Sequence, residues 1–339
     1  MTRAFTPRRA FGAALLLAAV VTGVLWLTPS GSYLLLPDPA HPVAPLVSVP
    51  AAKQHHESDG GGIYFIDVVE RRASLLERLL PGLHEGASLV PASAITPPGV
   101  SQRARHLEDE RDMRRSQSIA AAVALRALGY KVVARPAGVR VAAVFTDTPA
   151  AGRLEPTDTI VAVDGKRVRT LADLRRVMRR HRPGDSVRLR VESGPGLRTL
   201  VLKTIADPRT PGRPIIGISP EQAADIRLPF DVRIDSRGVV GPSAGLAFAL
   251  DVMEEFGRDV DHGYKVAATG ELELDGSVAP IGGARQKIFG ARRSHVDILL
   301  VPSGENAREA RRHADGVRVI PVKSFPQALH ALAKLRPKA

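Results

Sequence analysis

Residues 238–256 read GVVGPSAGLAFALDVMEEF and place one serine at the start of a helix. Gly241 and Pro242 form a tight turn, and proline suits the first turn of a helix. Apolar residues then recur at helical spacing, at Leu246, Leu250, Met253 and Phe256. Ser243 therefore lies among unpaired backbone N–H groups, which can stabilise the oxyanion of a tetrahedral intermediate. Taken alone, the segment is more typical of a helix N-cap than of a nucleophile.

A second segment supplies a base for that serine. Residues 268–287 read ATGELELDGSVAPIGGARQK, with Asp275-Gly276 at the turn of a hairpin and two glycines before another helix. Lys287 lies about one turn into this helix, and Ile288 and Ala291 provide apolar surroundings. Burial can lower the pKa of a lysine by several units, so that a neutral amine can accept the proton of a serine. Together the two segments predict a serine nucleophile with a lysine base.

These motifs closely resemble the Lon-type serine-lysine protease domain. The resemblance rests on Gly-Pro-Ser-Ala-Gly at 241–245, on Thr-Gly-Glu at 269–271, and on Pro-Ile-Gly-Gly at 280–283 with a lysine four residues later. It implies that Ser243 is the nucleophile, Lys287 the general base and Thr269 the hydroxyl that orients the lysine. The supporting positions of the same motif are Gly241, Pro242 and Ala244.

Two features separate this chain from the ATP-dependent members of that family. Those members carry an Asp just before Gly-Pro-Ser, where this chain has Val240. The sequence also holds no G-x-x-x-x-G-K-[ST] loop to bind nucleotide phosphates. We therefore expect an ATP-independent enzyme without a cofactor. We also expect no metal site, because His55-His56-Glu57 lacks the H-E-x-x-H spacing and is interpreted as a solvated run.

The middle of the chain resembles a bacterial PDZ domain. Its pattern predicts short strands and tight turns over 141–165, a helix over 171–181, and strands over 186–192 and 199–205. PDZ domains bind the ends of extended peptides by adding them to their sheet as a strand. The loop that would receive the terminal carboxylate has one candidate, Ala137-Gly138-Val139, and a plain tight turn is the alternative interpretation.

The order of the segments predicts an α+β fold in which a PDZ-like, β-rich domain is inserted into a Lon-type protease domain. A strand over 61–69 and a helix over 113–128, which carries Ser116-Gln117-Ser118, resemble the first part of the protease domain. Residues 209–214 would form the return linker, and residues 215–218 would resume the protease sheet. The predicted organisation is a basic tail at 1–10, a transmembrane helix at 11–27, a linker at 28–57, the first part of the protease domain at 58–131, the PDZ-like domain at 132–206 and the catalytic part at 213–335.

The N-terminal sequence predicts a single-pass membrane anchor. Residues 11–27 are an uncharged apolar stretch of 17 residues, which spans about 26 Å at about 1.5 Å per residue. Arg3, Arg8 and Arg9 precede it, whereas residues 28–52 contain no Lys or Arg. The positive-inside rule then places the N-terminus in the cytoplasm and the catalytic part outside the cell membrane. A cleavable signal peptide, with small residues at 30–32, is the alternative.

Composition sets wider bounds. The 339 residues, 44% of them hydrophobic, are enough for two compact domains. The absence of cysteine excludes disulfides, thiolate metal sites and a cysteine nucleophile. The net charge of +13 favours anionic partners, but the arginines are scattered and aromatic residues make up only 4%. We therefore expect no nucleic-acid partner, and a basic surface that faces anionic lipid or cell wall.

Alternatives exist for both the base and the activity. His262 or His295 could complete a Ser-His-Asp triad, but neither lies in a segment that places it near Ser243. Glu271 either borders the site or makes a structural hydrogen bond at a strand edge. The main hypothesis is a membrane-anchored endopeptidase that cleaves unfolded or extended peptide segments, with a PDZ-like domain that selects or gates them. The alternative is a catalytically inactive, membrane-bound adaptor that binds peptides, and the resemblance is compatible with a homo-oligomer in either case.

Overall fold

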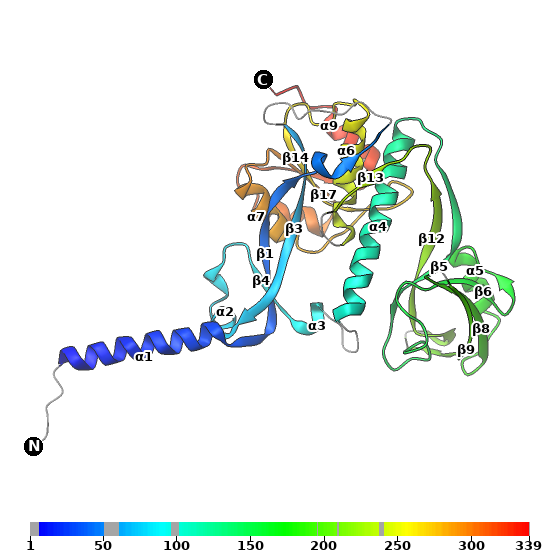
Figure 1. Ribbon diagram of the computed structural model, residues 1–339, viewed down its shortest axis with the longest axis horizontal. Coiled ribbons are helices and arrows are strands. Elements are labelled where there is room, and N and C mark those ends of the chain that lie inside the picture. The colour runs from blue at the N-terminus through cyan, green and yellow to red at the C-terminus, as the bar shows by residue number, and fades with distance from the viewer. Residues whose placement is uncertain are drawn as a thin grey trace, which may run out of the picture.

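A computed structural model describes residues 7–50, 61–95, 102–194, 196–208, 210–236 and 241–338. Beyond an N-terminal helix, the chain forms an α/β region around one six-stranded sheet and a smaller β-rich region beside it (Figure 1). Helix α4 (Gln102–Ala127) stands between these two regions. We keep the names α/β region and β-rich region below.

The sheet of the α/β region has the strand order β18-β17-β14-β3-β1-β4. The four strands β3, β14, β17 and β18 run parallel, and β1 pairs antiparallel with both β3 and β4. Every residue of β17 is buried, as expected for a parallel strand covered on both faces. The strands are β1 (Pro29–Pro42), β3 (Gly62–Ser74), β4 (Ser88–Pro91), β14 (Lys265–Ala268), β17 (Ile298–Pro302) and β18 (Arg318–Val322).

Helices cover both faces of this sheet. Val266 and Ala268 of β14 face a core shared with α4, α6 (Gly245–Glu255) and α9 (Phe325–Leu332). Ala267, between them, faces a second core with α7 (Ala284–Arg293) and α8 (Glu305–Arg312). This alternation follows from the period of two along a strand. Helix α6 is buried along its whole length, so the segment that begins at the serine is the centre of the first core.

The predicted linker at 28–57 is wrong for its described part. Residues 29–42 form β1, which lies inside the sheet, and Leu34 is fully enclosed. Prolines at 37, 39 and 42 argue against a strand in the sequence, because proline has no N–H group to donate to a neighbouring strand. A register shift between Pro37 and Ala40 accommodates them. After β1 the chain continues through η1 (Ala44–Leu46) and β2 (Val47–Ser48). His55-His56-Glu57 lie outside the described residues.

The N-terminal segment is helical, as α1 (Pro7–Leu27). Its large apolar side chains are exposed, among them Phe11, Leu16 and Leu17. Across the described residues, no helix combines the length and the hydropathy required of a membrane span, so the predicted transmembrane helix at 11–27 is not supported.

The β-rich region has its own sheet and its own core. Its strand order is β12-β5-β6-β8-β9, with β7 paired to β6. The core is formed by aliphatic residues such as Val139, Ile160 and Leu189, which do not belong to the cores of the α/β region. The elements are β5 (Val133–Val144), β6 (Thr159–Val163), β7 (Lys166–Arg167), α5 (Leu171–Met178), β8 (Ser186–Ser193), β9 (Gly196–Lys203), β10 (Ile205–Asp207), β11 (Thr210–Ile215) and β12 (Ile218–Arg227).

The predicted return to the protease sheet at 215–218, and with it the start of the catalytic part at 213, is wrong. Strand β12 instead pairs antiparallel with β5 along its whole length, from Ile218 opposite Val144 to Arg227 opposite Val133. The chain rejoins the α/β region only at β13 (Arg233–Ile234), which pairs with β2. The reason is that the backbone N–H and C=O groups along one side of the long strand β5 need hydrogen-bond partners, and β12 provides them.

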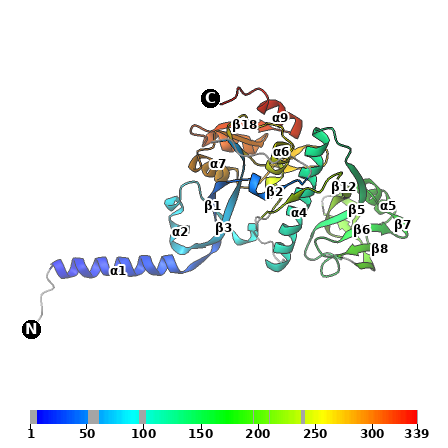
Figure 2. The ribbon, with the colours of Figure 1, turned by 45° about the horizontal axis from the view of Figure 1, so that its top comes forward.

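The paired strands β5 and β12 form a ribbon that rises from the β-rich region along α4 (Figures 1 and 2). Shorter elements complete the α/β region around the serine and at the far end of β3. They are α2 (Leu75–Leu79), η2 (Pro81–Leu83), α3 (Ala92–Ile95), η3 (Pro242–Ala244), β15 (Glu271–Leu272) and β16 (Val278–Ala279).

Candidate active site

Ser243 lies in the short turn η3 that leads directly into α6. Gly241 precedes it with φ of 91°, a backbone conformation that favours glycine. Ser243 is partly exposed, whereas Ala244 and all of α6 are buried, so the hydroxyl is accessible from one side only. The N–H groups at the start of a helix have no intrahelical partner, which leaves donors beside the hydroxyl. Gly238, Val239 and Val240 lie outside the described residues.

Lys287 reaches this hydroxyl from the other side of the sheet. Its Nζ donates to Ser243 Oγ at 3.1 Å and also to the carbonyl oxygen of Ile66 in β3. The side chain is 3% exposed. Burial lowers the pKa of Lys287 to about 8, against the opposing effect of the negative charge of Asp67. A lysine in this state loses its proton near neutral pH, as a general base must.

Two glycines bring α7 close enough to place this lysine. Gly283 precedes the helix with φ of 69°, and a Cβ there would lie 2.7 Å from a methyl group of Val68. At Gly290 a Cβ would lie 2.0 Å from the carbonyl oxygen of Asp38 in β1. A larger residue at Gly290 would require the backbone to shift, and one at Gly283 would have to displace Val68 and adopt an unfavourable φ. The sequence motif includes the first glycine but gives no signal for the second, because its contact is with β1, a strand that prolines obscure.

Thr269 does not have the role that the resemblance implied. Its hydroxyl donates to the carbonyl oxygen of Ser243 at 3.2 Å, rather than orienting Lys287. The N–H of Gly270 donates to the same carbonyl at 2.8 Å. The reason is that the chain after β14 runs beside η3, so that its polar groups meet the backbone of the nucleophile turn. Thr269 therefore positions the serine, and the lysine is held by Ile66 instead.

Helix α4 supports the same turn from outside the motifs. Ser116 donates from its hydroxyl to the carbonyl oxygen of Pro242 at 3.1 Å. A Cβ at Gly245 would lie 2.7 Å from this hydroxyl, so α4 and α6 approach closely at this point. The glycine that ends the Gly-Pro-Ser-Ala-Gly motif is thus required for helix packing. Sequence reasoning assigned Ser116 to a family helix without giving it a contact.

Other charged residues near the site differ in their contacts. Burial raises the pKa of Asp67, which is next to Ile66 in β3, while a hydrogen bond from the N–H of Val68 and the charge of Lys287 oppose that shift. Glu271 contacts Arg115 of α4 at 3.7 Å, in agreement with a structural role at a strand edge. The hydrogen bonds and ion pairs described for His262 and His295 do not include Ser243. Within the described ranges, no three His, Asp or Glu side chains are grouped as metal ligands.

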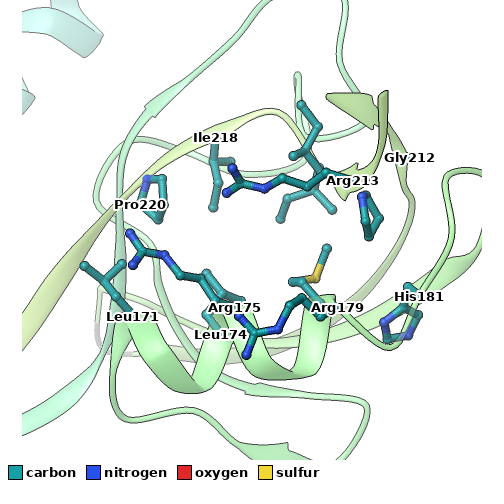
Figure 3. A pocket seen from close by; sticks show the side chains of 13 residues that line it. Leu171, Leu174, Arg175, Arg179, His181, Gly212, Arg213, Ile218 and Pro220 are labelled. Carbon is teal, nitrogen blue, oxygen red and sulfur yellow. The ribbon is translucent and has the colours of Figure 1, made fainter. Parts of the chain in front are cut away.

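A separate groove of about 760 Å³ lies in the β-rich region, between helix α5 and the strands β11 and β12 (Figure 3). Strand β12 is at the edge of its sheet, so one side of it is free to accept another strand. The predicted carboxylate loop at 137–139 is wrong. Gly138 lies inside β5 opposite Ala223, beside a register shift, and does not line the groove.

Comparison with known proteins identifies both regions. Residues 235–331 match the family of the Lon protease (S16) C-terminal proteolytic domain, and residues 126–204 match the PDZ domain family. The chain is 36% identical over 104 residues to Lon protease 2 of Bacillus subtilis, covering 30% of this chain and 18% of that protein. It is 36% identical over 94 residues to the Lon protease of Azorhizobium caulinodans, covering 26% of this chain and 11% of that protein.

The chain is also similar in sequence to PDZ domains of solved structure. The crystal structure of the PDZ domain of an SdrC-like protein from Listeria monocytogenes is 29% identical and covers 25% of this chain and 87% of that chain, with a TM-score of 0.23. The chain spans less than a fifth of the length of the curated Lon proteases named above. Ser243, Thr269 and Lys287 all lie within residues 235–331, the part that matches the Lon-type proteolytic domain.

Proposed function

We propose that this PDZ-containing, Lon-like protease is an ATP-independent serine endopeptidase with a dyad of Ser243 and Lys287. The observation that carries the proposal is the contact of 3.1 Å between Lys287 Nζ and Ser243 Oγ at a buried lysine. Burial and the hydroxyl contact are the two conditions that a lysine base has to meet. The match of residues 235–331 to a proteolytic domain supports the same reaction class.

In the proposed reaction, neutral Lys287 accepts the proton of Ser243 as Oγ attacks the carbonyl carbon of a peptide bond. The N–H groups at the start of α6 stabilise the oxyanion that forms. The protonated lysine then donates to the leaving amine, and the C–N bond breaks to give an acyl-enzyme. Water that loses a proton to Lys287 hydrolyses this ester and restores the serine. Thr269 and Ser116 act on the backbone of 242–243 and keep the hydroxyl in place.

ATP independence is proposed from the sequence, which carries no nucleotide-binding loop of the G-x-x-x-x-G-K-[ST] type. Without an unfolding motor, the enzyme cleaves segments that are already extended or unfolded. The groove between α5 and β12 supports a role in choosing them, because a peptide end can add to the free edge of β12. Addition of ATP and Mg²⁺ is expected to leave the rate of cleavage of an unfolded protein unchanged.

The location of the enzyme is proposed from its charge pattern alone. Three arginines lie among residues 1–10, and residues 28–52 contain no Lys or Arg, which favours a catalytic part outside the cytoplasm. Protease added to intact spheroplasts should then degrade the chain without lysis. Protection until the cells are lysed would contradict this location, and fractionation of the same cells shows whether the chain is held at the membrane.

A peptide-binding adaptor without catalytic activity is the competing function, and one labelling experiment separates the two. Purified full-length protein is treated with a fluorophosphonate, which reacts only with activated serines, and is tested in parallel for cleavage of unfolded casein. We expect labelling and cleavage in the wild type and neither in Ser243→Ala or Lys287→Ala. Ser118→Ala is the matched control, because this exposed serine of α4 bonds within its own helix and to no other element among the described residues. Unlabelled wild-type protein that binds peptides would favour the adaptor.

A further inference from the structure

We propose that the groove between α5 and β12 selects peptide ends in which acidic side chains accompany apolar ones. This inference rests on the proposed role of the groove in choosing substrates, and it names the chemical class that is chosen.

The walls of the groove combine aliphatic surface with positive charge. Leu174 and Met178 from α5 and Ile216 and Ile218 from the opposite side supply the apolar part. Arg175 belongs to α5, Arg179 is the C-cap residue that follows this helix, and Arg213 belongs to β11. Figure 3 shows the side chains of Arg175 and Arg213 on opposite walls of the opening. A ligand that fills the groove thus meets guanidinium groups on both sides.

These charges are not balanced within the groove. Among the described residues that line it, none is an aspartate or a glutamate. His181 also lines the groove, but its ring already contacts Asp164 at 2.8 Å. Arg213 lies 3.6 Å from Asp207 and is largely exposed. No ion pair is described for Arg175 or Arg179 within the described ranges, so their five-donor guanidinium groups are available to carboxylates.

The backbone at the end of the groove can receive an extended peptide. The carbonyl oxygen of Gly217 accepts from the N–H of Phe145, which lies on the β5 side. The carbonyl and the N–H of one peptide unit point in opposite directions, so the N–H of Ile218 faces the free edge of β12. A peptide strand that pairs there lies between the arginines of α5 and that of β11.

Residues 334–338 of the same chain are a poor occupant. They include Lys334, Arg336 and Lys338, which have the same sign of charge as the groove. Lys338 is also held in the α/β region, where its amine contacts Asp297 at 2.6 Å. Charge complementarity therefore favours a peptide end from another chain, with Asp or Glu side chains near an apolar terminus.

Fluorescence anisotropy with labelled peptides tests the preference. Three peptides share an apolar C-terminal residue and carry either two Asp, two Asn or two Lys at the same upstream positions. The protein is the full chain with Ser243→Ala, so that binding is measured without cleavage. We expect the Asp peptide to bind about tenfold more tightly than the Asn peptide, the Lys peptide to bind most weakly, and the difference to shrink at high salt.

Substitutions in the groove make the test specific. Arg175→Gln with Arg179→Gln should abolish the preference for Asp while binding of the Asn peptide persists, and Arg175→Glu should favour the Lys peptide. Arg176→Gln is the matched control, because Arg176 belongs to the same helix, pairs with Asp173 and does not line the groove. Equal affinity for all three peptides, or no binding of any, would overturn the proposal. Cleavage of casein by the wild type is scored separately, so that this failure is distinct from a failure of the proposed activity.

Discussion

Lys287 and Arg140 are both cations in enclosed positions, but their neighbours differ. Lys287 meets a hydroxyl and a carbonyl oxygen, and burial lowers its pKa to about 8. Burial also acts to lower the pKa of Arg140, but hydrogen bonds from its guanidinium group to Glu221 and Asp112 outweigh burial and raise this pKa. The two residues show that burial lowers the pKa of a cation, and that this effect is outweighed where carboxylates accept hydrogen bonds from it.

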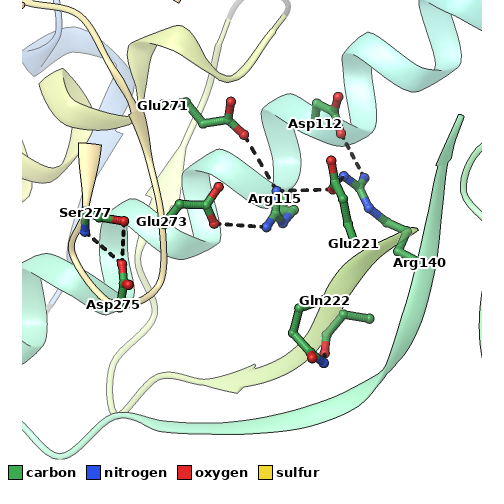
Figure 4. Close-up of polar contacts among 10 residues, drawn as sticks. Asp112, Arg115, Arg140, Glu221, Gln222, Glu271, Glu273, Asp275 and Ser277 are labelled. Atoms are coloured by element: carbon green, nitrogen blue, oxygen red, sulfur yellow. Dashed lines mark hydrogen bonds and ion pairs between the residues drawn. The ribbon is translucent and has the colours of Figure 1, made fainter. Parts of the chain in front are cut away.

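Arg140 belongs to a charged cluster that joins the two regions, which we call the joint. It consists of Asp112 and Arg115 from α4, Arg140 and Glu221 from the β5–β12 ribbon, and Glu271 and Glu273 after β14. Arg115 lies 3.6 Å from Glu221, 3.7 Å from Glu271 and 3.2 Å from Glu273 (Figure 4). Next to Arg115 in the sequence, Ser116 holds the nucleophile turn. The same helix therefore contacts both the β-rich region and the turn that carries Ser243.

Among the predictions, the largest effect on activity is expected when Lys287 is replaced by Arg. Lys287→Arg keeps a positive charge, but a guanidinium group does not lose its proton at accessible pH. We expect cleavage of casein to fall by about a thousandfold or more, as for the loss of a general base. The reciprocal change, Arg140→Lys, keeps the charge where no proton has to leave, and activity should stay within about threefold of wild type. If Lys287→Arg kept a tenth of the activity, the lysine would not be the base.

Stability should change in the opposite direction to activity at this lysine. The folded-state pKa of about 8 lies below the ordinary 10.5, so the unfolded chain binds more protons between these values and wild-type stability rises with pH there. Replacing the lysine by Met removes a buried charge. We expect the free energy of unfolding of Lys287→Met to be higher at pH 7 by about 3 kcal/mol. This figure is the shift in the pKa of Lys287 from 10.5 to about 8, converted at 1.36 kcal/mol per pKa unit.

Urea unfolding at pH 7 and at pH 10 measures this gain for Lys287→Met. The gain should shrink toward pH 10, because the wild-type lysine is then neutral in the folded state and the pH lies close to the unfolded pKa of 10.5, so that little of the cost of deprotonation remains. Ser243→Ala serves as the control, since it abolishes activity without a change in charge. A gain that stays constant with pH would show that it comes from packing and not from the charge.

The contact between Ser243 and Lys287 could be predicted from sequence because its determinants are local. Gly241 and Pro242 define a turn before a helix, and Gly283 defines the start of the helix that carries Lys287. Strand β1 and the pairing of β12 with β5 could not be predicted, since prolines interrupt the first and the second joins segments about 80 residues apart. The joint depends on that pairing, because Arg140 and Glu221 come together only when the ribbon forms.

Removing the carboxylate-bound cation should cost stability, unlike removal of the lysine. Arg140→Met deprives Asp112 and Glu221 of a shared partner, and both carboxylates are partly exposed and can be hydrated. We expect a loss of about 1 to 2 kcal/mol in the free energy of unfolding. Arg176→Met, at an exposed pair, should cost about 0.5 kcal/mol or less. Thermal unfolding at low and high salt checks both, and an unchanged stability in Arg140→Met would mean that the joint does not hold the regions together.

The smallest expected effect comes from Asp67, the carboxylate whose charge acts on Lys287 without a direct bond between them in the described contacts. That charge opposes the fall in the pKa of Lys287, so Asp67→Asn should lower this pKa further and move the rising limb of the pH–rate profile toward lower pH. Below the wild-type midpoint the variant should be about threefold more active, as for a screened charge interaction of under 1 kcal/mol. The plateau rate at high pH should not change, because Lys287 is neutral there in both proteins.

Two outcomes would contradict this role of Asp67. The pH–rate profile of Asp67→Asn could move to higher pH, or its plateau could fall while its midpoint stays in place. Either result would mean that Asp67 holds β3 in place and does not change the pKa of the lysine. In that case the lowered pKa of Lys287 would be explained by burial alone, and the nearby carboxylate of Asp67 would have no effect on it.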